Sequence, residues 1–130
     1  PSEKLNVLIA DDNQDAAITM GWILEAKGCQ VQVVEDGPSA LKAVESFTPD
    51  LVMLDIGMPG MNGYDLCAAL RKKRARAPAI FVAQTGWGQP SHIQRSKEAG
   101  FDHHLVKPLD LSDLERIVAE ARQAKAIRRN

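Results

Sequence analysis

The sequence lacks most of the features that mark specialised protein classes. It has only two cysteines, Cys29 and Cys67, far apart and without a Cys-x-x-Cys spacing, which argues against a disulfide framework or a zinc site and favours a reducing compartment. No apolar run approaches the ~20 residues that cross a bilayer, and no signal peptide precedes the first predicted strand. The net charge of -1 gives no global attraction to nucleic acid or to an anionic membrane. We therefore predict a cytoplasmic protein that contacts neither directly.

What remains is an ordinary globular composition, with 45% hydrophobic and 25% charged residues. A chain of 130 residues is the size of one domain. Such a domain buries about two thirds of its unfolded surface, which is enough to fold without disulfides or metal. Without internal repeats or linkers, the sequence predicts a single domain over residues 1–130.

Short apolar runs alternate with helical patterns along the chain. The runs predict strands at residues 5–10, 31–34, 51–54, 79–83 and 101–106. The helical patterns predict helices at residues 14–27, 37–46, 64–71, 91–99 and from 111 onward, the last with Asp110 as its N-cap. The fourth of these helices has a thin apolar stripe, chiefly Ile93 and Ala99.

The first predicted helix has a clear apolar stripe, which consists of Ala16, Met20, Ile23 and Leu24. Trp22 lies off this stripe, so we expect it to be partly exposed. Gly28 is a suitable C-terminal stop.

The alternation of strands and helices predicts an α/β fold with a parallel sheet. The strands are almost continuously apolar, as expected when helices cover both faces of the sheet. Right-handed crossovers restrict the topology to a doubly wound sheet, for which a five-stranded, flavodoxin-like order 2-1-3-4-5 is the common solution.

Chemically unusual residues stand where the predicted strands end: Asp11 and Asp12 after the first, Asp55 after the third, Thr85 after the fourth and Lys107 after the fifth. The carboxyl ends of parallel strands share one edge of the sheet, which is where open α/β sheets bind ligands. In the predicted order the first and third strands are neighbours, so three carboxylates meet there.

Three adjacent carboxylates repel each other unless a cation compensates their charge. Their hard oxygen donors favour Mg²⁺, with Mn²⁺ as the alternative. With a cation present, one carboxylate can attack phosphorus as a nucleophile, and a lysine and a threonine can neutralise charge on the side away from the metal. Taken singly, an aspartate of this kind is often a helix cap, Thr85 a turn residue and Lys107 a solvated lysine. Their joint placement makes those separate explanations improbable.

Four ordered motifs now carry a family resemblance: residues 7–13 (VLIADDN), 50–63 (DLVMLDIGMPGMNG), 84–86 (QTG) and 106–108 (VKP). Together they resemble the receiver domain of bacterial two-component response regulators, over about residues 5–122. The resemblance implies a signalling domain rather than an enzyme in its own right, although a receiver promotes its own phosphorylation and dephosphorylation. Its implied partner is a sensor histidine kinase or a histidine phosphotransfer domain.

Carried over residue by residue, the resemblance implies that Asp55 accepts a phosphoryl group from a phosphohistidine. It implies that Mg²⁺ is bound by Asp12 and Asp55, by Asp11 largely through water, and by the backbone carbonyl of Gly57. Thr85 and Lys107 would contact the phosphoryl oxygens. It also implies a cis bond before Pro108 and, on phosphorylation, repacking of the surface formed by the fourth helix, the fifth strand and the last helix.

The sequence departs from the family pattern at His104, where receivers usually have a tyrosine or phenylalanine that rotates during switching. Either His104 takes that role, which would make switching sensitive to pH, or it is a surface histidine at a strand end. Gly57 and Trp87 stand two residues beyond Asp55 and Thr85, respectively. In this family the residues at these two positions border the phosphoryl site. Gly57 leaves that side open, whereas Trp87 could shield the site, contact a partner or cover the loop. Residues 99–108 (AGFDHHLVKP) are similar to the receivers of hybrid sensor histidine kinases, which would place the domain in a membrane-anchored kinase.

Two rivals share the α/β architecture. A Mg²⁺-dependent phosphatase of the haloacid dehalogenase type needs Asp-x-Asp after its first strand, whereas this chain reads Asp11-Asp12-Asn13 and has no cap domain. A flavin carrier would place the flavin phosphate against an acidic loop that repels it. The motifs do not distinguish three settings for a receiver: a stand-alone regulator, a stage of a phosphorelay, or one domain of a larger kinase.

Overall fold

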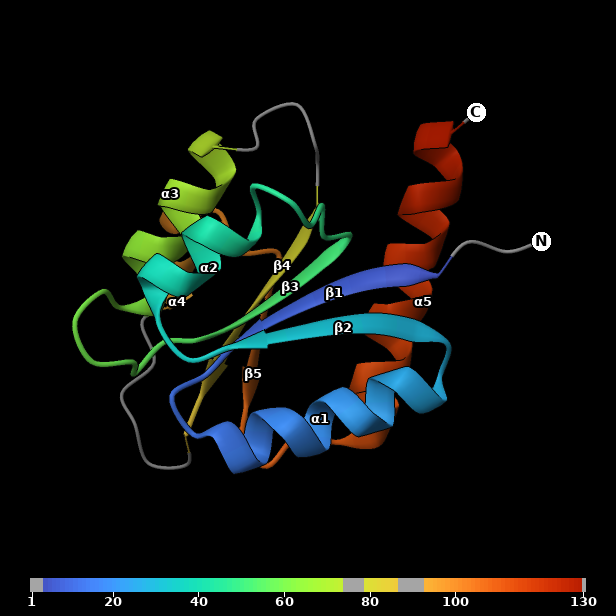
Figure 1. Cartoon of the computed structure of the whole chain (residues 1–130), viewed down its shortest axis with the longest axis horizontal. Coiled ribbons are helices and arrows are strands. Elements are labelled where there is room, and N and C mark those ends of the chain that lie inside the picture. Colours follow the sequence, from blue (N-terminus) through green and yellow to red (C-terminus); the bar gives the residue numbers. More distant parts are fainter. Residues whose placement is uncertain (1–3, 74–78, 87–92, 130) are drawn as a thin grey trace.

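The computed structural model describes residues 4–73, 79–86 and 93–129. Within them five parallel strands form one sheet in the order β2-β1-β3-β4-β5, as Figure 1 shows. The strands are β1 (Leu5–Ala10), β2 (Cys29–Val34), β3 (Leu51–Asp55), β4 (Ile80–Thr85) and β5 (His103–Val106). The helices are α1 (Gln14–Ala26), α2 (Gly37–Ala43), α3 (Gly63–Lys73), α4 (Ile93–Ala99) and α5 (Leu111–Arg129). The doubly wound fold and its strand order are confirmed.

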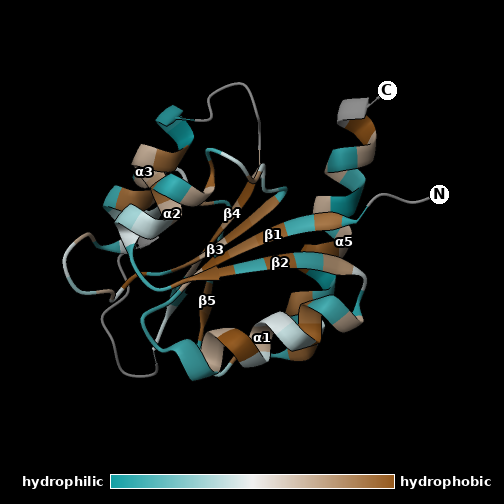
Figure 2. Cartoon of the chain, in the orientation of Figure 1, coloured by the Kyte–Doolittle hydropathy of each residue, from teal (hydrophilic) through white to brown (hydrophobic). Residues whose placement is uncertain are grey.

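Helices cover both faces of the sheet, with α1 and α5 on one side and α2, α3 and α4 on the other (Figure 1). Each face has its own apolar core. Leu5, Val7, Ile9, Met53 and Val82 face α1 and α5. Alternate positions of the same strands face the other three helices. The central strands β3 and β4 are therefore apolar along most of their length, whereas β2 also has hydrophilic residues (Figure 2).

The predicted boundaries differ from the observed ones by a few residues. β2 begins at Cys29 and β4 extends to Thr85, whereas β5 begins only at His103 and α2 already ends at Ala43. The extra strand residues are polar or small, and pairing with a neighbouring strand holds them in the sheet, as in the pair Leu5–Cys29. Of the predicted fourth helix, residues 91–92 lie outside the described part.

The buried face of α1 is Ala17, Gly21 and Leu24, which is shifted from the predicted stripe. Ala16, assigned to that stripe, is exposed, so this part of the prediction is wrong. The reason is Gly21, which a hydrophobicity pattern does not count as apolar, although it lets α1 approach β2 to within contact of Val31. Trp22 is 67% exposed, as expected.

Side chains at the ends of α1 and α2 explain where these helices begin and end. Asn13 is the N-cap of α1 and accepts a hydrogen bond from the N–H of Ala16, and Asp36 caps α2 in the same way. Beyond α1, Gly28 has φ +89°, a left-handed conformation that suits the predicted stop. The cap at Asn13 leaves Asp11 and Asp12 just outside the helix, at the carboxyl edge of the sheet.

At the opposite edge of the sheet, buried Asp50 joins the start of β3 to two other elements. Its Oδ2 accepts hydrogen bonds from the N–H of Asn6, at 2.8 Å, and from Nζ of Lys125 on α5, at 2.9 Å. Since its side chain is only 7% exposed, the ion pair is shielded from solvent and holds the far end of α5 against the sheet. No helix in the described part of the chain is long and apolar enough to span a membrane.

Candidate phosphorylation site

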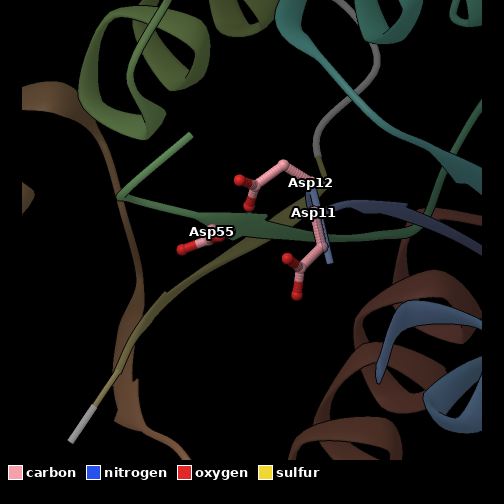
Figure 3. A group of neighbouring side chains, drawn as sticks. All are labelled: Asp11, Asp12 and Asp55. Atoms are coloured by element: carbon pink, nitrogen blue, oxygen red, sulfur yellow. The ribbon is translucent and has the colours of Figure 1, made fainter. Parts of the chain in front are cut away.

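Three carboxylates meet at the carboxyl edge of the sheet, as the order of the strands predicts. One carboxylate oxygen from each of Asp11, Asp12 and Asp55 lies within 4.8 Å of the others, and Figure 3 shows the three side chains at the ends of β1 and β3. Asp11 and Asp55 are buried, with 3% and 7% of their surface exposed, whereas Asp12 is exposed. The cluster therefore has a buried part and an opening to solvent.

Backbone and side-chain donors hold Asp11 in place. Its Oδ1 accepts a hydrogen bond from the N–H of Asn13 at 2.9 Å, and its own N–H donates to the carbonyl of Val34 at 3.1 Å. The side chain of Gln14 donates to the Asp11 carbonyl at 2.6 Å. This turn between β1 and α1 fixes the position of the acidic pair.

Asp55 ends β3, and its two oxygens have different surroundings. Oδ1 accepts a hydrogen bond from the N–H of Gly57 at 3.0 Å, whereas Oδ2 lies 4.0 Å from Nζ of Lys107. Burial raises the pKa of Asp55 to about 6. The N–H of Gly57 and the ammonium of Lys107 oppose this rise, and the other two carboxylates add to it. At neutral pH Asp55 is therefore mostly ionised.

Lys107 lies at the end of β5 and reaches across β4 and β3 to the acidic cluster. Its ammonium donates a hydrogen bond to Oδ2 of Asp11 at 2.7 Å, so its nearer partner is Asp11 rather than Asp55. The bond between Lys107 and Pro108 is cis, as the resemblance implied. A single lysine thus offsets part of the negative charge on two strands.

The hydroxyl of Thr85 contacts His104 and forms no hydrogen bond to the carboxylates among the described residues. Thr85 ends β4, one residue beyond Gln84, which pairs with Asp55 in the sheet. Its Oγ1 lies 3.4 Å from Nε2 of His104, and Nδ1 of the same imidazole lies 3.0 Å from Oγ of Ser96 on α4. His104 is only half-buried, yet its imidazole lies between two hydroxyls rather than in solvent.

The donor set of the cluster fits a hard divalent cation. Three carboxylates at one point, one of them with its pKa raised to about 6, are in excess over the single ammonium that reaches them among the described residues. Oxygen donors with an open, exposed side are typical of Mg²⁺ sites, which retain several waters. No imidazole or thiolate lies among these ligands, so a zinc site is not indicated.

Two contributors to the site were missed from the sequence. Gly63, at the start of α3, packs so closely that a Cβ there would lie 2.9 Å from the carbonyl oxygen of Asp55, and its place in the motif at 50–63 was a usable signal. Ser96 gave no signal, because its partner is eight residues away on a different element. Trp87 lies outside the described residues, so its predicted roles stay predictions.

Comparison with known proteins agrees with this geometry. Residues 7–119 match the family model "Response regulator receiver domain". The chain is 33% identical over 124 residues to the DNA-binding response regulator MtrA of Mycobacterium tuberculosis, covering 95% of this chain and 51% of that protein. It is 36% identical over 111 residues to the sensory transduction protein RegX3 of Mycolicibacterium smegmatis, covering 84% and 46%. The chain thus spans about half the length of these curated relatives.

Solved structures give the same result. A response regulator receiver domain protein (CheY-like) from Methanospirillum hungatei superposes with a TM-score of 0.86 at 25% identity, over 97% of this chain and 99% of that one. A CheY-like receiver domain from Methylobacillus flagellatus has a TM-score of 0.81 at 32% identity, over 92% and 99%. The receiver domain of a signal transduction histidine kinase from Syntrophus aciditrophicus has a TM-score of 0.80 at 29% identity, over 92% and 90%.

Proposed function

The chain belongs to the response regulator receiver domains of two-component systems, and from this premise we propose that it is a switch activated by phosphorylation of Asp55. The observation that supports this proposal most directly is the acidic cluster, in which a buried, mostly ionised carboxylate lies beside two others and 4.0 Å from an ammonium. The phosphatase alternative has no comparable support, because the matching family is a signalling domain.

The proposed reaction is a direct phosphoryl transfer. A carboxylate oxygen of Asp55 attacks the phosphorus of a phosphohistidine on a sensor histidine kinase or a histidine phosphotransfer domain. A P–O bond forms, the P–N bond breaks, and the electron pair stays on the imidazole nitrogen, which takes up a proton. Such a transfer depends on positioning and charge neutralisation more than on covalent chemistry by the protein.

Asp12, Asp55 and the carbonyl of Gly57 are the residues that would hold Mg²⁺ directly, with Asp11 contributing largely through water. When bound, Mg²⁺ would neutralise charge on the transferring phosphoryl oxygens. The N–H of Gly57 orients one oxygen of Asp55. Burial excludes water from the carboxylate, and this strengthens its interaction with nearby cations.

Lys107 supplies the second cation of the proposed mechanism. In the structure its ammonium binds Asp11 and lies 4.0 Å from Asp55. A phosphoryl group on Asp55 would extend into this gap, so a small movement of the side chain brings the ammonium to a phosphoryl oxygen. Thr85 would move its hydroxyl toward the same group, and His104 would follow it and transmit the change to α4, β5 and α5.

Two kinds of relative suggest different outputs. MtrA is named a DNA-binding regulator, and the chain aligns with about half of it, whereas the Syntrophus receiver belongs to a histidine kinase. We propose that the receiver itself contacts a histidine-bearing partner and neither nucleic acid nor membrane. The rest of the protein, rather than this domain, would carry any output.

Labelling with acetyl phosphate tests the proposal. The protein should gain one phosphoryl group in intact-mass spectra when Mg²⁺ is present and none when EDTA replaces it. Asp55→Ala should abolish the gain. The control Asp65→Asn, which changes an exposed acid in the first turn of α3, should be labelled like the wild type. Labelling that persists in Asp55→Ala would contradict the assignment.

A further inference from the structure

The imidazole of His104 lies between two hydroxyl groups that belong to different elements. Oγ of Ser96 on α4 lies 3.0 Å from Nδ1, and Oγ1 of Thr85 at the end of β4 lies 3.4 Å from Nε2. Both serine and threonine are almost fully buried, at 3% and 1% exposure. Two buried hydroxyls and a half-buried imidazole thus form a row of hydrogen-bonded side chains that leads from the end of β4 to α4.

The two contacts differ in strength. A distance of 3.0 Å is an ordinary hydrogen bond, whereas 3.4 Å is long for one. Ser96 is therefore the firmer partner of the imidazole, and the contact with Thr85 is the looser one. Burial lowers the pKa of His104 below its usual value and so favours the neutral imidazole, which has one N–H.

A neutral imidazole between two hydroxyls has two proton arrangements. In the first, Ser96 donates to Nδ1, Nε2–H donates to Thr85, and the hydroxyl proton of Thr85 is available to another acceptor. In the second, Nδ1–H donates to Ser96 and Thr85 donates to Nε2, so that the spare hydroxyl proton is that of Ser96 on α4 instead of that of Thr85 at the end of β4. Among the described residues neither hydroxyl has a hydrogen-bond partner besides His104.

Phosphorylation distinguishes the two arrangements. In the first, Thr85 can donate to a phosphoryl oxygen while it still accepts from Nε2–H. The two hydroxyl protons and the imidazole N–H then all have acceptors. In the second, Thr85 must leave Nε2 to reach the anion. Among the described residues the proton of Ser96 and the lone pair of Nε2 then both lack a partner, which is costly because Ser96 is buried and His104 is half-buried.

We propose that Ser96 is a positioning residue: by donating to Nδ1 it holds His104 as the Nε2–H tautomer, so that Thr85 keeps its own proton for the phosphoryl group on Asp55. This inference rests on the proposed function, since it assumes that an anion forms there. It also gives switching a physical link to α4. The phosphoryl oxygen would accept from Thr85, and the hydrogen bonds would then continue through His104 to Ser96 on α4.

The imidazole ¹⁵N shifts of the metal-free, unphosphorylated protein test the tautomer directly, because protonated and unprotonated ring nitrogens resonate far apart. His104 of the wild type should show a protonated Nε2 and an unprotonated Nδ1. Ser96→Ala should give a mixture of tautomers, and Ser96→Thr should restore the wild-type pattern. His103, whose imidazole contacts Glu120 on the other face of the sheet, is an internal control that should not respond.

The second readout is the rate of phosphorylation by acetyl phosphate in Mg²⁺. Loss of one hydrogen bond that acts through Thr85 should lower the rate about threefold to tenfold in Ser96→Ala, and Ser96→Thr should recover it. A wild-type His104 with its proton on Nδ1, or a tautomer unchanged in Ser96→Ala, overturns the inference even if Asp55 is labelled normally. Absence of labelling in the wild type would instead overturn the proposed function and leave the tautomer result intact.

Discussion

Substitution of Asp55 by asparagine should stabilise the metal-free protein at high pH. The side chain is 10% exposed, and burial raises its pKa from 3.8 to about 6. The difference corresponds to about 3 kcal/mol by which folding disfavours the ionised carboxylate. An amide of nearly the same shape removes this cost and can still accept the hydrogen bond from the N–H of Gly57. Asp55→Asn should therefore have the larger free energy of unfolding.

The sign of the pH dependence follows from the direction of the shift. Because the folded pKa lies above the unfolded one, the folded protein binds the proton more tightly, and the wild type loses stability as pH rises from about 4 to about 6. The advantage of Asp55→Asn should be greatest at pH 8, about half as large at pH 5, and near zero by pH 3.

Urea unfolding in EDTA at pH 8 and pH 5 measures the effect. With an m-value of about 2 kcal/mol/M, the midpoint at pH 8 should rise by about 1.5 M in Asp55→Asn. Mg²⁺ at ten times its dissociation constant should then stabilise the wild type by about 1.4 kcal/mol and the variant much less. Asp65→Asn should behave like the wild type. If Asp55→Asn is no more stable than the wild type at pH 8, burial does not disfavour the ionised form of this carboxylate and the reasoning fails.

Three further predictions can be checked by urea unfolding. Gly63→Ala should cost about 1–3 kcal/mol, because its Cβ would lie 2.9 Å from the backbone oxygen of Asp55; the matched Gly21→Ala, with its nearest neighbour at 3.5 Å, should instead gain about 0.5–1 kcal/mol, and equal effects would refute both. Arg71→Lys should cost about 1–2 kcal/mol. The guanidinium donates a 2.7 Å hydrogen bond to the carbonyl of Gly100 and also stacks on the ring of Phe81, and lysine cannot keep both contacts. Asp50→Ala should cost about 3 kcal/mol, since it removes a buried anion that binds α5 and β1; a change under 0.5 kcal/mol would show that this ion pair adds nothing.

The sequence predicted the sheet because its signal is local and repeated. Each strand is an apolar run, and parallel topology then places the residues after the runs at one edge, so the meeting of Asp11, Asp12 and Asp55 followed from chain order alone. The buried face of α1 was misjudged at Ala16 because close packing at Gly21 depends on the neighbouring strand. A hydrophobicity pattern does not include such a contact.

Side-chain partners within the site were less predictable than its location. That Lys107 would bind Asp11 rather than Asp55 depends on a difference of 2.7 Å against 4.0 Å, which spacing along the chain does not determine. The contact of His104 with Ser96 depends on where α4 packs against the sheet. Strand ends can be read from sequence, whereas the choice among neighbouring partners needs coordinates.

The two adjacent histidines of β5 also have a consequence for strand alignment. His103 contacts Glu120 of α5 on one face, and His104 contacts Ser96 of α4 on the other. β5 has only four residues and lies at the edge of the described sheet, where β4 is its neighbour. A slip by one residue would exchange the two imidazoles between the faces and break both contacts together. The two histidines therefore favour the one alignment of β5 with β4 in which Lys107 lies beside Asp11 and Asp55.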